Sequence, residues 1–534
     1  MKLSTIVFAV LLVTASGLFA SGVYEIAAVT KIGRIDTGAG QGAAKTVAYS
    51  RRHRSLCIAN PAKTALEIVS ISVPSRPNVR GRRSVDLSEF GASVEGLAIH
   101  DDLIAVAVGA EDVTSPGRVV FFDFRGRHRG SVEVGPGPGM LVFTRDGKRL
   151  LVANEGRPSD DYTVDPDGSV TIIGIEEGLG VGAVRRAGFE AFNERREELL
   201  SAGVRIFGPN ATVAQDLEPE SIAVSENSET AWISLQENNA IAELDIESGA
   251  ITSIYPLGFK DHGKEGGGID ASDMDGGIHI RSRPVYGMYQ PDSLAAFTDG
   301  GVTYLATANE GARREYDGFN EVARVADLEL DPEAFPDAAR LKRSGNLGRL
   351  HVTTTLGDLD GDGDYDRLYS FGGRSFSIWR LAGGALDLVY DSGEDFERVT
   401  AGLDPRSFNC SGGVSKRFDH RSDDSGVEPE GIAVGYWLGQ RYAFIGLKHG
   451  LGGVLIYNIT DPAGPRFVRY VLSNDGSGRR GNDLSPEGIA YIHTLHAPEP
   501  YPILAVAYRH SGTVALYKFA AKEDEEEDEE KGEE

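Results

Sequence analysis

A short motif, an acidic residue followed by three small or apolar residues, recurs along the whole chain. Its copies stand at 95–98, 220–223, 292–295, 430–433 and 487–490, with a degenerate copy at 139–142. Each copy is followed by an apolar run, a turn and a second alternating run. Runs rich in Val, Ile, Tyr and Phe, with Gly and Asp between them, are typical of antiparallel strands. The repeat therefore predicts a series of similar strand groups that stack on one another.

The spacing predicts an all-β chain that forms a closed β-propeller of four-stranded blades. The two closest copies start about 43 residues apart, the length of one blade. Two less regular units, at 46–73 and 352–381, bring the blade count to eight, or to seven if one of them is a partial blade. The early run 24–35 is expected to supply the outer strand of the last blade. Two separate sandwiches are the alternative, but the repeat spans most of the chain.

We expect three regions: a signal peptide at 1–22, a single propeller domain at 23–519 and a disordered acidic tail at 520–534. The first has Lys2, a short apolar run and small residues where a signal peptidase cuts, and no second hydrophobic segment follows. This pattern predicts a secreted or cell-surface protein without a transmembrane segment. Three further segments look like insertions on the ring's faces, and the first of them is helix-forming. They are 189–200, 258–284 and 322–341.

Secretion agrees with two other features of the sequence. Acceptor sequons for N-glycosylation begin at Asn210, Asn409 and Asn458. Cys57 and Cys410 are able to pair in an oxidising compartment, although nothing in the sequence brings them together.

The net charge of -26 argues against nucleic acid as a partner, because its phosphates would be repelled. Divalent cations are the natural counter-ligands of such a chain. The terminal acidic run is expected to solubilise the protein or to capture calcium weakly.

The sharpest chemical motif is an acidic loop at 358–366, in which aspartates alternate with other residues. Oxygen ligands at alternate positions, with a glycine that turns the chain, wrap a hard cation such as calcium. The expected side-chain ligands are Asp358, Asp360, Asp362 and Asp366, with Asp364 contributing its backbone oxygen. Tyr369 stands where an EF-hand needs a bidentate Glu, so we expect a loop between the first two strands of a blade. An ordinary Asp-Gly turn is the alternative.

A second set of polar residues emerges when the blades are aligned. The residues just past the second strand are Asn60, Glu111, Glu155, Glu237, Glu310, Arg374, His449 and His510. Because neighbouring strands are antiparallel, these residues share one face of the ring with the acids that open the repeats. The opening acids are Glu95, Glu220, Asp292, Glu430 and Glu487.

So many like charges at one mouth are costly unless they bind cations or pair with basic groups. We therefore predict a metal site that includes Glu155, Glu310 and Glu430. In a phosphate-handling version of the site, Arg374 and His510 would steady phosphoryl oxygens. The alternative is that each acid caps its own blade by accepting backbone hydrogen bonds.

Several longer motifs together resemble the choice-of-anchor I family over nearly the whole mature chain. They are 152–162, 235–240, 270–273, 284–292, 307–311 with 314–319, the loop at 358 with 373–378, and 421–424 with 428–431. That family includes mesenchyme-specific cell surface glycoproteins of biomineralising cells and atypical alkaline phosphatases of cyanobacteria. The resemblance implies a secreted or surface-attached propeller that handles calcium and phosphate. This chain differs from the family pattern at Lys448-His449 and Arg509-His510, where relatives tend to carry a glutamate, and at Arg313, where an acid is usual.

Two functional hypotheses follow. The first is an extracellular calcium-binding protein whose acidic surface meets mineral or extracellular matrix. The second is a metal-dependent phosphomonoesterase in which a metal-bound water attacks a phosphate ester. A propeller that binds only proteins is a third possibility, but it leaves the acids at the mouth without a purpose.

Overall fold

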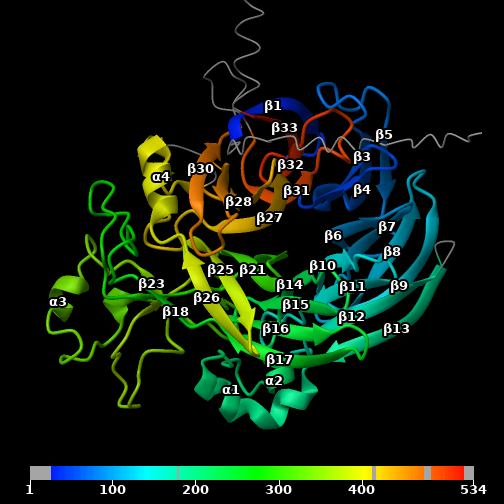
Figure 1. Ribbon diagram of the computed structural model, residues 1–534. Helices are drawn as coiled ribbons and strands as arrows, with labels where there is room; N and C mark the ends of the chain where they lie inside the picture. Colours follow the sequence, from blue (N-terminus) through cyan, green and yellow to red (C-terminus); the bar gives the residue numbers. More distant parts are fainter. Residues whose placement is uncertain are drawn as a thin grey trace, which may run out of the picture.

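The computed structural model describes residues 26–176, 180–403, 405–411, 417–450, 452–473 and 483–521 (Figure 1). The predicted signal peptide at 1–22 lies outside the described residues, as does the predicted acidic tail apart from Ala520 and Ala521. Among the helices in these ranges, none combines the length and the apolar character needed to cross a bilayer.

In the described ranges the chain forms seven four-stranded antiparallel sheets, numbered 1 to 7 in the order of their first strands, with the edge strand from the start of the chain given last in sheet 7. Sheet 1 is β2 (Val47–Ser50), β3 (Ser55–Asn60), β4 (Ala65–Ser70) and β5 (Arg82–Asp86). Sheet 2 is β6 (Ser93–His100), β7 (Leu103–Gly109), β8 (Pro116–Asp123) and β9 (His128–Pro136). Sheet 3 is β10 (Pro138–Phe143), β11 (Arg149–Asn154), β12 (Ser169–Glu176) and β13 (Gly180–Gly188).

The other four sheets follow the same plan. Sheet 4 is β14 (Pro219–Val224), β15 (Thr230–Leu235), β16 (Ala240–Asp245) and β17 (Ala250–Pro256). Sheet 5 is β20 (Ser293–Asp299), β21 (Val302–Asn309), β25 (Ser375–Ala382) and β26 (Ala385–Asp391). Sheet 6 is β27 (Pro429–Trp437), β28 (Gln440–Leu447), β29 (Val454–Asn458) and β30 (Arg466–Val471). Sheet 7 is β31 (Pro486–Ile492), β32 (Ile503–Tyr508), β33 (Thr513–Ala521) and β1 (Ile26–Asp36).

The amino-acid composition of each strand depends on its position within the sheet. The second strands are almost uninterrupted apolar runs, and β7 is buried along its whole length because it is covered on both faces. The fourth strand β5 reads Arg-Arg-Ser-Val-Asp and is mostly exposed. An apolar cluster lies between sheets 1 and 2, and similar clusters fill each following interface up to sheets 6 and 7. A further cluster joins sheet 7 to sheet 1, so every sheet has a packed neighbour on both sides.

Sheet 7 joins the two ends of the described chain. β1 pairs with β33 in antiparallel register, from Ile26 opposite Ala521 to Asp36 opposite Thr513. The prediction that the early run supplies an outer strand for the last unit is therefore confirmed. The strand β33 continues two residues beyond the predicted domain boundary at 519, because its last residues still pair with β1.

An eighth sheet has five short strands and does not belong to the repeat. Its strand order is β18 (Phe259–Asp261), β19 (Tyr286–Met288), β24 (Tyr369–Ser370), β23 (His351–Thr353) and β22 (Val322–Arg324). The interpretation of 352–381 as a blade is wrong: β23 and β24 lie in this accessory sheet, whereas β25 pairs with β21 in sheet 5. Two of its strands, β18 and β22, lie in segments that the sequence marks as insertions, whereas β19, β23 and β24 lie outside them.

Short helices occur only in connections of the described chain. They are η1 (Pro61–Lys63), η2 (Glu190–Arg195), α1 (Arg196–Ala202), α2 (Val213–Asp216), η3 (Val325–Asp327), α3 (Ala338–Leu341), α4 (Asp395–Leu403) and η4 (Pro405–Ser407). The elements η2 and α1 confirm the helix expected in the charged segment 189–200. The chain is thus all-β with short helical insertions.

The structure places the cysteines and the sequons. Cys57 and Cys410 are both buried and are not joined by a disulfide, the possibility that the sequence left open. Asn409 and Asn458 are also buried, because both sit inside packed structure, and only the sequon at Asn210 is exposed. A glycan on the folded chain is therefore expected at Asn210 alone among these three.

Candidate functional site

The repeated acids sit where the first strands of the sheets change register. In β6, β14, β27 and β31 the ladder to the second strand shifts at the acidic motif. Such a bulge adds a residue to one strand and re-aims its side chain. The bulges carry Glu95, Glu220, Glu430 and Glu487, and Asp292 directly precedes β20. The repeated motif therefore marks a local β-bulge that directs a carboxylate side chain away from the regular strand pairing.

Four of these acids line one pocket of about 210 Å³ between the first strands. They are Glu95, Glu220, Asp292 and Glu487, and Lys45 joins them. Lys45 Nζ lies 2.8 Å from an oxygen of Glu95. Glu430 lines a neighbouring pocket of about 330 Å³ together with Lys448, Glu487, Arg509 and His510. The acids that open the repeats thus gather at the common centre of the sheets.

Negative charge at this centre is only partly neutralised. Burial and then the nearby Glu155 and Asp292 raise the pKa of Glu220 well above its usual value. Burial also raises the pKa of Glu430, although Lys448 opposes the shift. The ammonium group of Lys448 is shared, at 2.7 Å from Glu310 Oε1 and 3.5 Å from Glu430 Oε1.

The effect of this excess charge on the stability of the fold can be measured at Asp292. Burial and the nearby Glu310 raise the pKa of Asp292 to about 7. The folded protein then holds a proton that the unfolded chain lacks between about pH 4 and pH 7, so stability falls as the pH rises through this window. We expect Asp292→Asn to raise the melting temperature of the metal-free protein at pH 8 and to leave it unchanged at pH 5. Thermal unfolding in EDTA at both pH values checks this; a lower melting temperature at pH 8 would contradict it.

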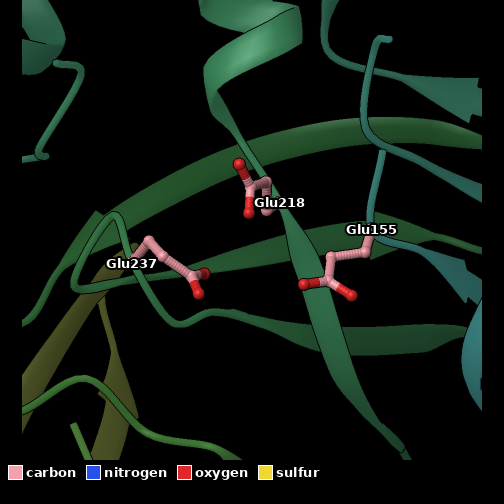
Figure 2. Close-up of side chains that lie close together, drawn as sticks. All are labelled: Glu155, Glu218 and Glu237. Atoms are coloured by element: carbon pink, nitrogen blue, oxygen red, sulfur yellow. The ribbon is translucent and has the colours of Figure 1, made fainter. Parts of the chain in front are cut away.

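A tighter group of three carboxylates lies at the edge of this centre. Glu155, Glu218 and Glu237 each offer an oxygen within 4.8 Å of the others, and Figure 2 shows the three side chains pointing toward a common space. Glu155 and Glu218 are buried and Glu237 partly so. Burial, followed by the charge of Glu155, raises the pKa of Glu237. Its Oε2 atom is buried and accepts no hydrogen bond.

Basic groups near this cluster do not neutralise all of it. Arg157 pairs with Glu155 and is half exposed. Arg314, which is 1% exposed, places Nη2 at 2.7 Å from Glu218 Oε1 and also pairs with Asp216. The pKa of Glu218 is nevertheless raised, because burial outweighs the attraction of Arg314. Two cations therefore face a local group of four carboxylates.

Sequence reasoning placed Glu155 and Glu237 at this face but missed Glu218. Glu218 stands two residues before Glu220, outside the aligned positions. The Glu-Pro-Glu pattern at 218–220 returns at 428–430, where Glu428 likewise faces the centre near Lys448 and His449. This second copy of the Glu-Pro-Glu pattern is the feature of the sequence that could have identified Glu218.

The structure does not unite the predicted set of Glu155, Glu310 and Glu430. Glu310 and Glu430 both contact Lys448, and Glu310 also accepts a hydrogen bond from Gln236 Nε2 at 3.0 Å. Glu155 joins Glu218 and Glu237 instead. The reason is geometric, since the three residues belong to sheets 3, 5 and 6.

Arg374 lies apart from the predicted mouth, which corrects its expected place. Its side chain is 2% exposed, and Nη1 donates to Asp270 O at 2.8 Å and to Glu397 Oε1 at 2.7 Å. Nη2 donates to Ser422 O at 2.9 Å and to Asp424 O at 2.5 Å. These bonds make Arg374 a buried cross-link between segments. His510, in contrast, is exposed and lines the pocket that contains Glu430.

The acidic loop lies in the accessory sheet, between β23 and β24, and not between the first two strands of a four-stranded sheet. Asp358, Asp360 and Asp362 are exposed, and each has an oxygen within 4.8 Å of the others. Asp366 Oδ2 accepts a hydrogen bond from the Leu359 amide at 2.8 Å. Asp364 is also on the loop, where the charges of its neighbours add to desolvation in raising its pKa. Calcium at this loop stays a prediction.

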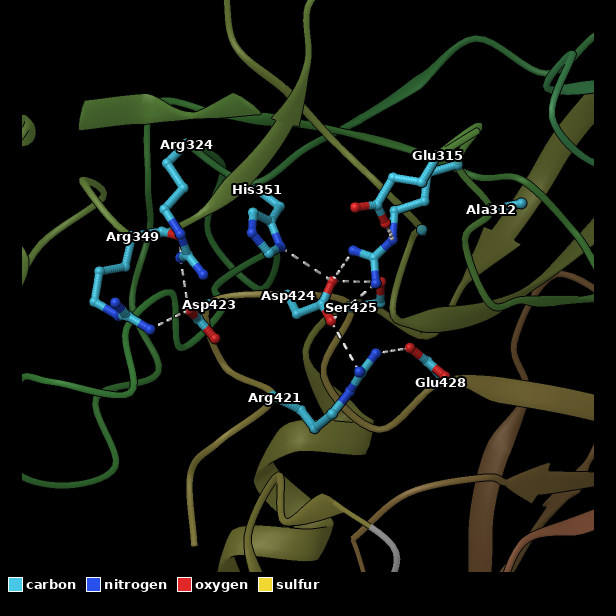
Figure 3. A network of polar contacts seen from close by, with 12 residues as sticks. Ala312, Glu315, Arg324, Arg349, His351, Arg421, Asp423, Asp424, Ser425 and Glu428 are labelled. Carbon is cyan, nitrogen blue, oxygen red and sulfur yellow. Dashed lines mark hydrogen bonds and ion pairs between the residues drawn. The ribbon is translucent and has the colours of Figure 1, made fainter. Parts of the chain in front are cut away.

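A charged network joins the accessory sheet to the centre (Figure 3). Asp424 lies 2.8 Å from Arg421 and 3.5 Å from His351, and it also pairs with Arg313. Despite burial, the contact with His351 and the hydrogen bonds from Arg313 hold the pKa of Asp424 far below its usual value. Arg421 also pairs with Glu428, which connects this network to Lys448. Arg313, which departs from the family pattern, is thus a partner of a half-buried acid.

The repeated four-stranded sheets and the carboxylates on their first strands define an all-β repeat protein with an acidic centre. A model of the choice-of-anchor I domain matches residues 45–462. The chain belongs to the choice-of-anchor I family.

Two curated relatives support this assignment. Gigasin-3a of Magallana gigas is 32% identical over 185 residues, which cover 32% of this chain and 64% of the relative. The mesenchyme-specific cell surface glycoprotein of Strongylocentrotus purpuratus is 29% identical over 300 residues, which cover 50% of this chain and 38% of the relative. The matched regions span less than two thirds of either relative.

Solved structures also align with the chain at low identity. Hydrazine synthase of Kuenenia stuttgartiensis aligns with 90% of this chain and 96% of its own, at 13% identity and a TM-score of 0.45. The β-propeller domain of Cps50 (Swd1) from Myceliophteria thermophila aligns with 92% of this chain and 99% of its own, at 10% identity and a TM-score of 0.45.

Proposed function

We propose that this protein is an extracellular or cell-surface calcium-binding protein whose seven sheets close into a propeller around a cation site. The proposal for closure rests on packing. Each of the seven sheets has an apolar cluster on both sides, including the cluster between sheet 7 and sheet 1. A ring in which every sheet has two neighbours leaves no open face.

The observation that carries the cation site is the cluster of Glu155, Glu218 and Glu237. Three carboxylates within 4.8 Å are costly when they are buried, because like charges and desolvation both oppose ionisation. A divalent cation removes both costs. The donor atoms are all oxygens, which suits calcium, and Glu237 Oε2 has no competing hydrogen-bond donor. Calcium would be held by these three residues, with Arg157 and Arg314 balancing the remaining charge.

The proposed cellular location and the proposed contact with mineral rest on the relatives and on the sequence. One relative is named a cell surface glycoprotein, and the first residues of this chain predict a signal peptide. The net charge of -26 and the exposed acidic loop at 358–366 suit contact with calcium-bearing mineral or matrix. The loop is proposed as a second, weaker calcium site, because its carboxylates are exposed.

Calcium titration of the metal-stripped protein tests the proposal. We expect Glu155→Gln combined with Glu237→Gln to remove one equivalent of tightly bound calcium in calorimetry. The rise in melting temperature that calcium gives the native protein should shrink with it; one site saturated to 100 times its Kd contributes about 2.7 kcal/mol. Glu111→Gln combined with Glu133→Gln is the charge-matched control, since both residues are exposed. Equal stoichiometry in both double variants would contradict the site.

A metal-dependent phosphomonoesterase is the second candidate, favoured by basic groups beside the acids. Lys448 and Arg509 line the same pocket as Glu430 and His510, so an anion would meet both a cation-binding edge and positive charge. Glu430→Gln decides the question when phosphate release from a simple monoester is followed after calcium is restored. Turnover that depends on Glu430 would favour the enzyme, whereas calcium binding without turnover would leave the binding protein.

A further inference from the structure

A second group of buried acids lies away from the centre, between two segments that are far apart in the sequence. Asp270 and Asp275 belong to the connection between β18 and β19, and Asp419 to the segment that leads into β27. One carboxylate oxygen of each lies within 4.8 Å of the others. Asp270 is 0% exposed, Asp419 is 2% exposed and the Asp275 side chain is 5% exposed. These acids are buried more deeply than those of the loop at 358–366.

The donors around the cluster hold the carboxylates in place without using all their oxygens. The His279 amide donates to Asp270 Oδ2 at 2.6 Å, and the Ser422 hydroxyl donates to Asp419 Oδ1 at 2.5 Å. Asp275 Oδ2 is different, because it is buried and accepts no hydrogen bond. The nearest basic atoms to it are His279 Nδ1 at 2.9 Å and Arg281 Nη2 at 3.9 Å. A buried carboxylate oxygen without a hydrogen-bond donor calls for another partner.

Other charged groups nearby are already engaged. Asp273 pairs with Arg349, and Arg374 pairs with Glu397 at 2.7 Å. Burial and the like charges of Asp270 and Asp275 raise the pKa of Asp419 to about 8. Within the described chain, Asp275 therefore pairs only with His279 and Arg281, whose side chains are about half exposed, and Asp270 and Asp419 form no ion pair.

We propose that Asp270, Asp275 and Asp419 form a second site for a hard divalent cation of the calcium and magnesium class. Three carboxylates supply only oxygen donors, which such cations prefer over nitrogen or sulfur. The hydrogen bonds from His279 and Ser422 act behind the ligands and fix their orientation. This site is separate from the group of Glu155, Glu218 and Glu237 and does not depend on it.

The position of the site gives the cation a structural role. The segment 269–281 is closed by an isolated bridge between Ile269 and Arg281, and Ile269 packs in one apolar cluster with Val352 of β23 in the accessory sheet. Asp419 precedes Glu428 and Glu430, which face the acidic centre. A cation at this point ties the accessory sheet to the segment that enters sheet 6. Arg374 joins the same two segments through Asp270 O and Ser422 O, so the cation and Arg374 act side by side.

Hydrogen exchange of the full chain, measured in EDTA and then with calcium, magnesium or manganese added, tests the proposal. In the native protein we expect a cation to slow amide exchange in 269–281 and 417–426 by about tenfold or more. Asp275→Asn should abolish this slowing while the chain stays folded, because Asp275 Oδ2 accepts no hydrogen bond and its two ion-pair partners, His279 and Arg281, are about half exposed. Glu265→Gln, an exposed change in the same insertion, should respond like the native protein.

The test separates this site from the one at the centre. Glu155→Gln combined with Glu237→Gln should keep the cation-dependent slowing in 269–281. If the native protein shows no slowing in these segments with any of the three cations, the proposal is wrong, whatever the variants do. An Asp275→Asn protein that keeps the full response would overturn it as well.

Discussion

Replacing Arg374 by methionine is expected to destabilise the folded protein strongly. The guanidinium is buried and donates to Glu397 and to three backbone carbonyl oxygens. Methionine has a similar length but no donor, so Glu397, which is 1% exposed, would lose its charged partner. Removing one partner of a buried ion pair costs about 3–5 kcal/mol of unfolding free energy. Chemical denaturation monitored by Trp fluorescence measures this loss.

A matched substitution at Arg380, on the strand that follows Arg374, separates the effect of burial from that of charge. Arg380 lies on β25 and pairs with Asp387 at 3.0 Å, but both side chains are about half exposed. Exposed pairs contribute about 0.2–1 kcal/mol, so Arg380→Met should change stability little. Arg374→Lys should fall between the two, because lysine keeps the charge but does not reproduce the planar fork. If Arg374→Met were as stable as Arg380→Met, the cross-link would not hold the insertions as described.

Removing β1 is expected to prevent the chain from reaching a stable fold. The strand covers β33, and its Ile35 is fully buried in the cluster between sheets 7 and 1. Its Lys31 and Arg34 also pair with Asp483, whose side chain is 0% exposed. A chain that starts after Asp36 would leave an unpaired edge, a buried acid without its two basic partners and an uncovered apolar cluster. Solubility and the loss of a cooperative thermal transition report the result.

Adding the strand back as a separate peptide provides the control. A synthetic peptide of residues 26–36 should restore cooperative unfolding to the truncated chain, because the remaining strands form its template. The same peptide with Ile35→Lys should fail, since the lysine would enter the apolar cluster. A truncated chain that unfolds cooperatively without any peptide would show that β1 is dispensable.

The local part of this fold is readable from the sequence, and the reason is the period of the repeat. Fully buried second strands such as β7 have to be apolar along their whole length, and turns between them need Gly and Asp. The acid at each bulge is equally local, because a register shift is needed to turn it inward. These features made the strands, the helix at 189–200 and the pairing of the chain's two ends predictable.

Contacts between insertions were not predictable from the sequence, because they depend on how long connecting segments pack in the folded chain. The unit 352–381 has strand-like composition, yet its strands divide between the accessory sheet and sheet 5. Arg374 follows the pattern of a mouth residue, but the partners that bury it come from other segments of the chain. Glu218 joined Glu155 only through the packing of sheet 3 against sheet 4. Asp270 and Asp419 likewise meet across a distance that no sequence period encodes.

The pairing of β1 with β33 also has a consequence for protein synthesis. A ribosome makes β1 first and β33 last, so sheet 7 stays incomplete until nearly all of the described chain has been translated. Until then, one face of sheet 1 lacks the apolar neighbour that it has in the folded protein. A chain that terminates early keeps that face exposed, and exposed apolar surface is a target for chaperones and proteases. Completion of sheet 7 thus requires both β1 and β33, the first and last strands of the described chain.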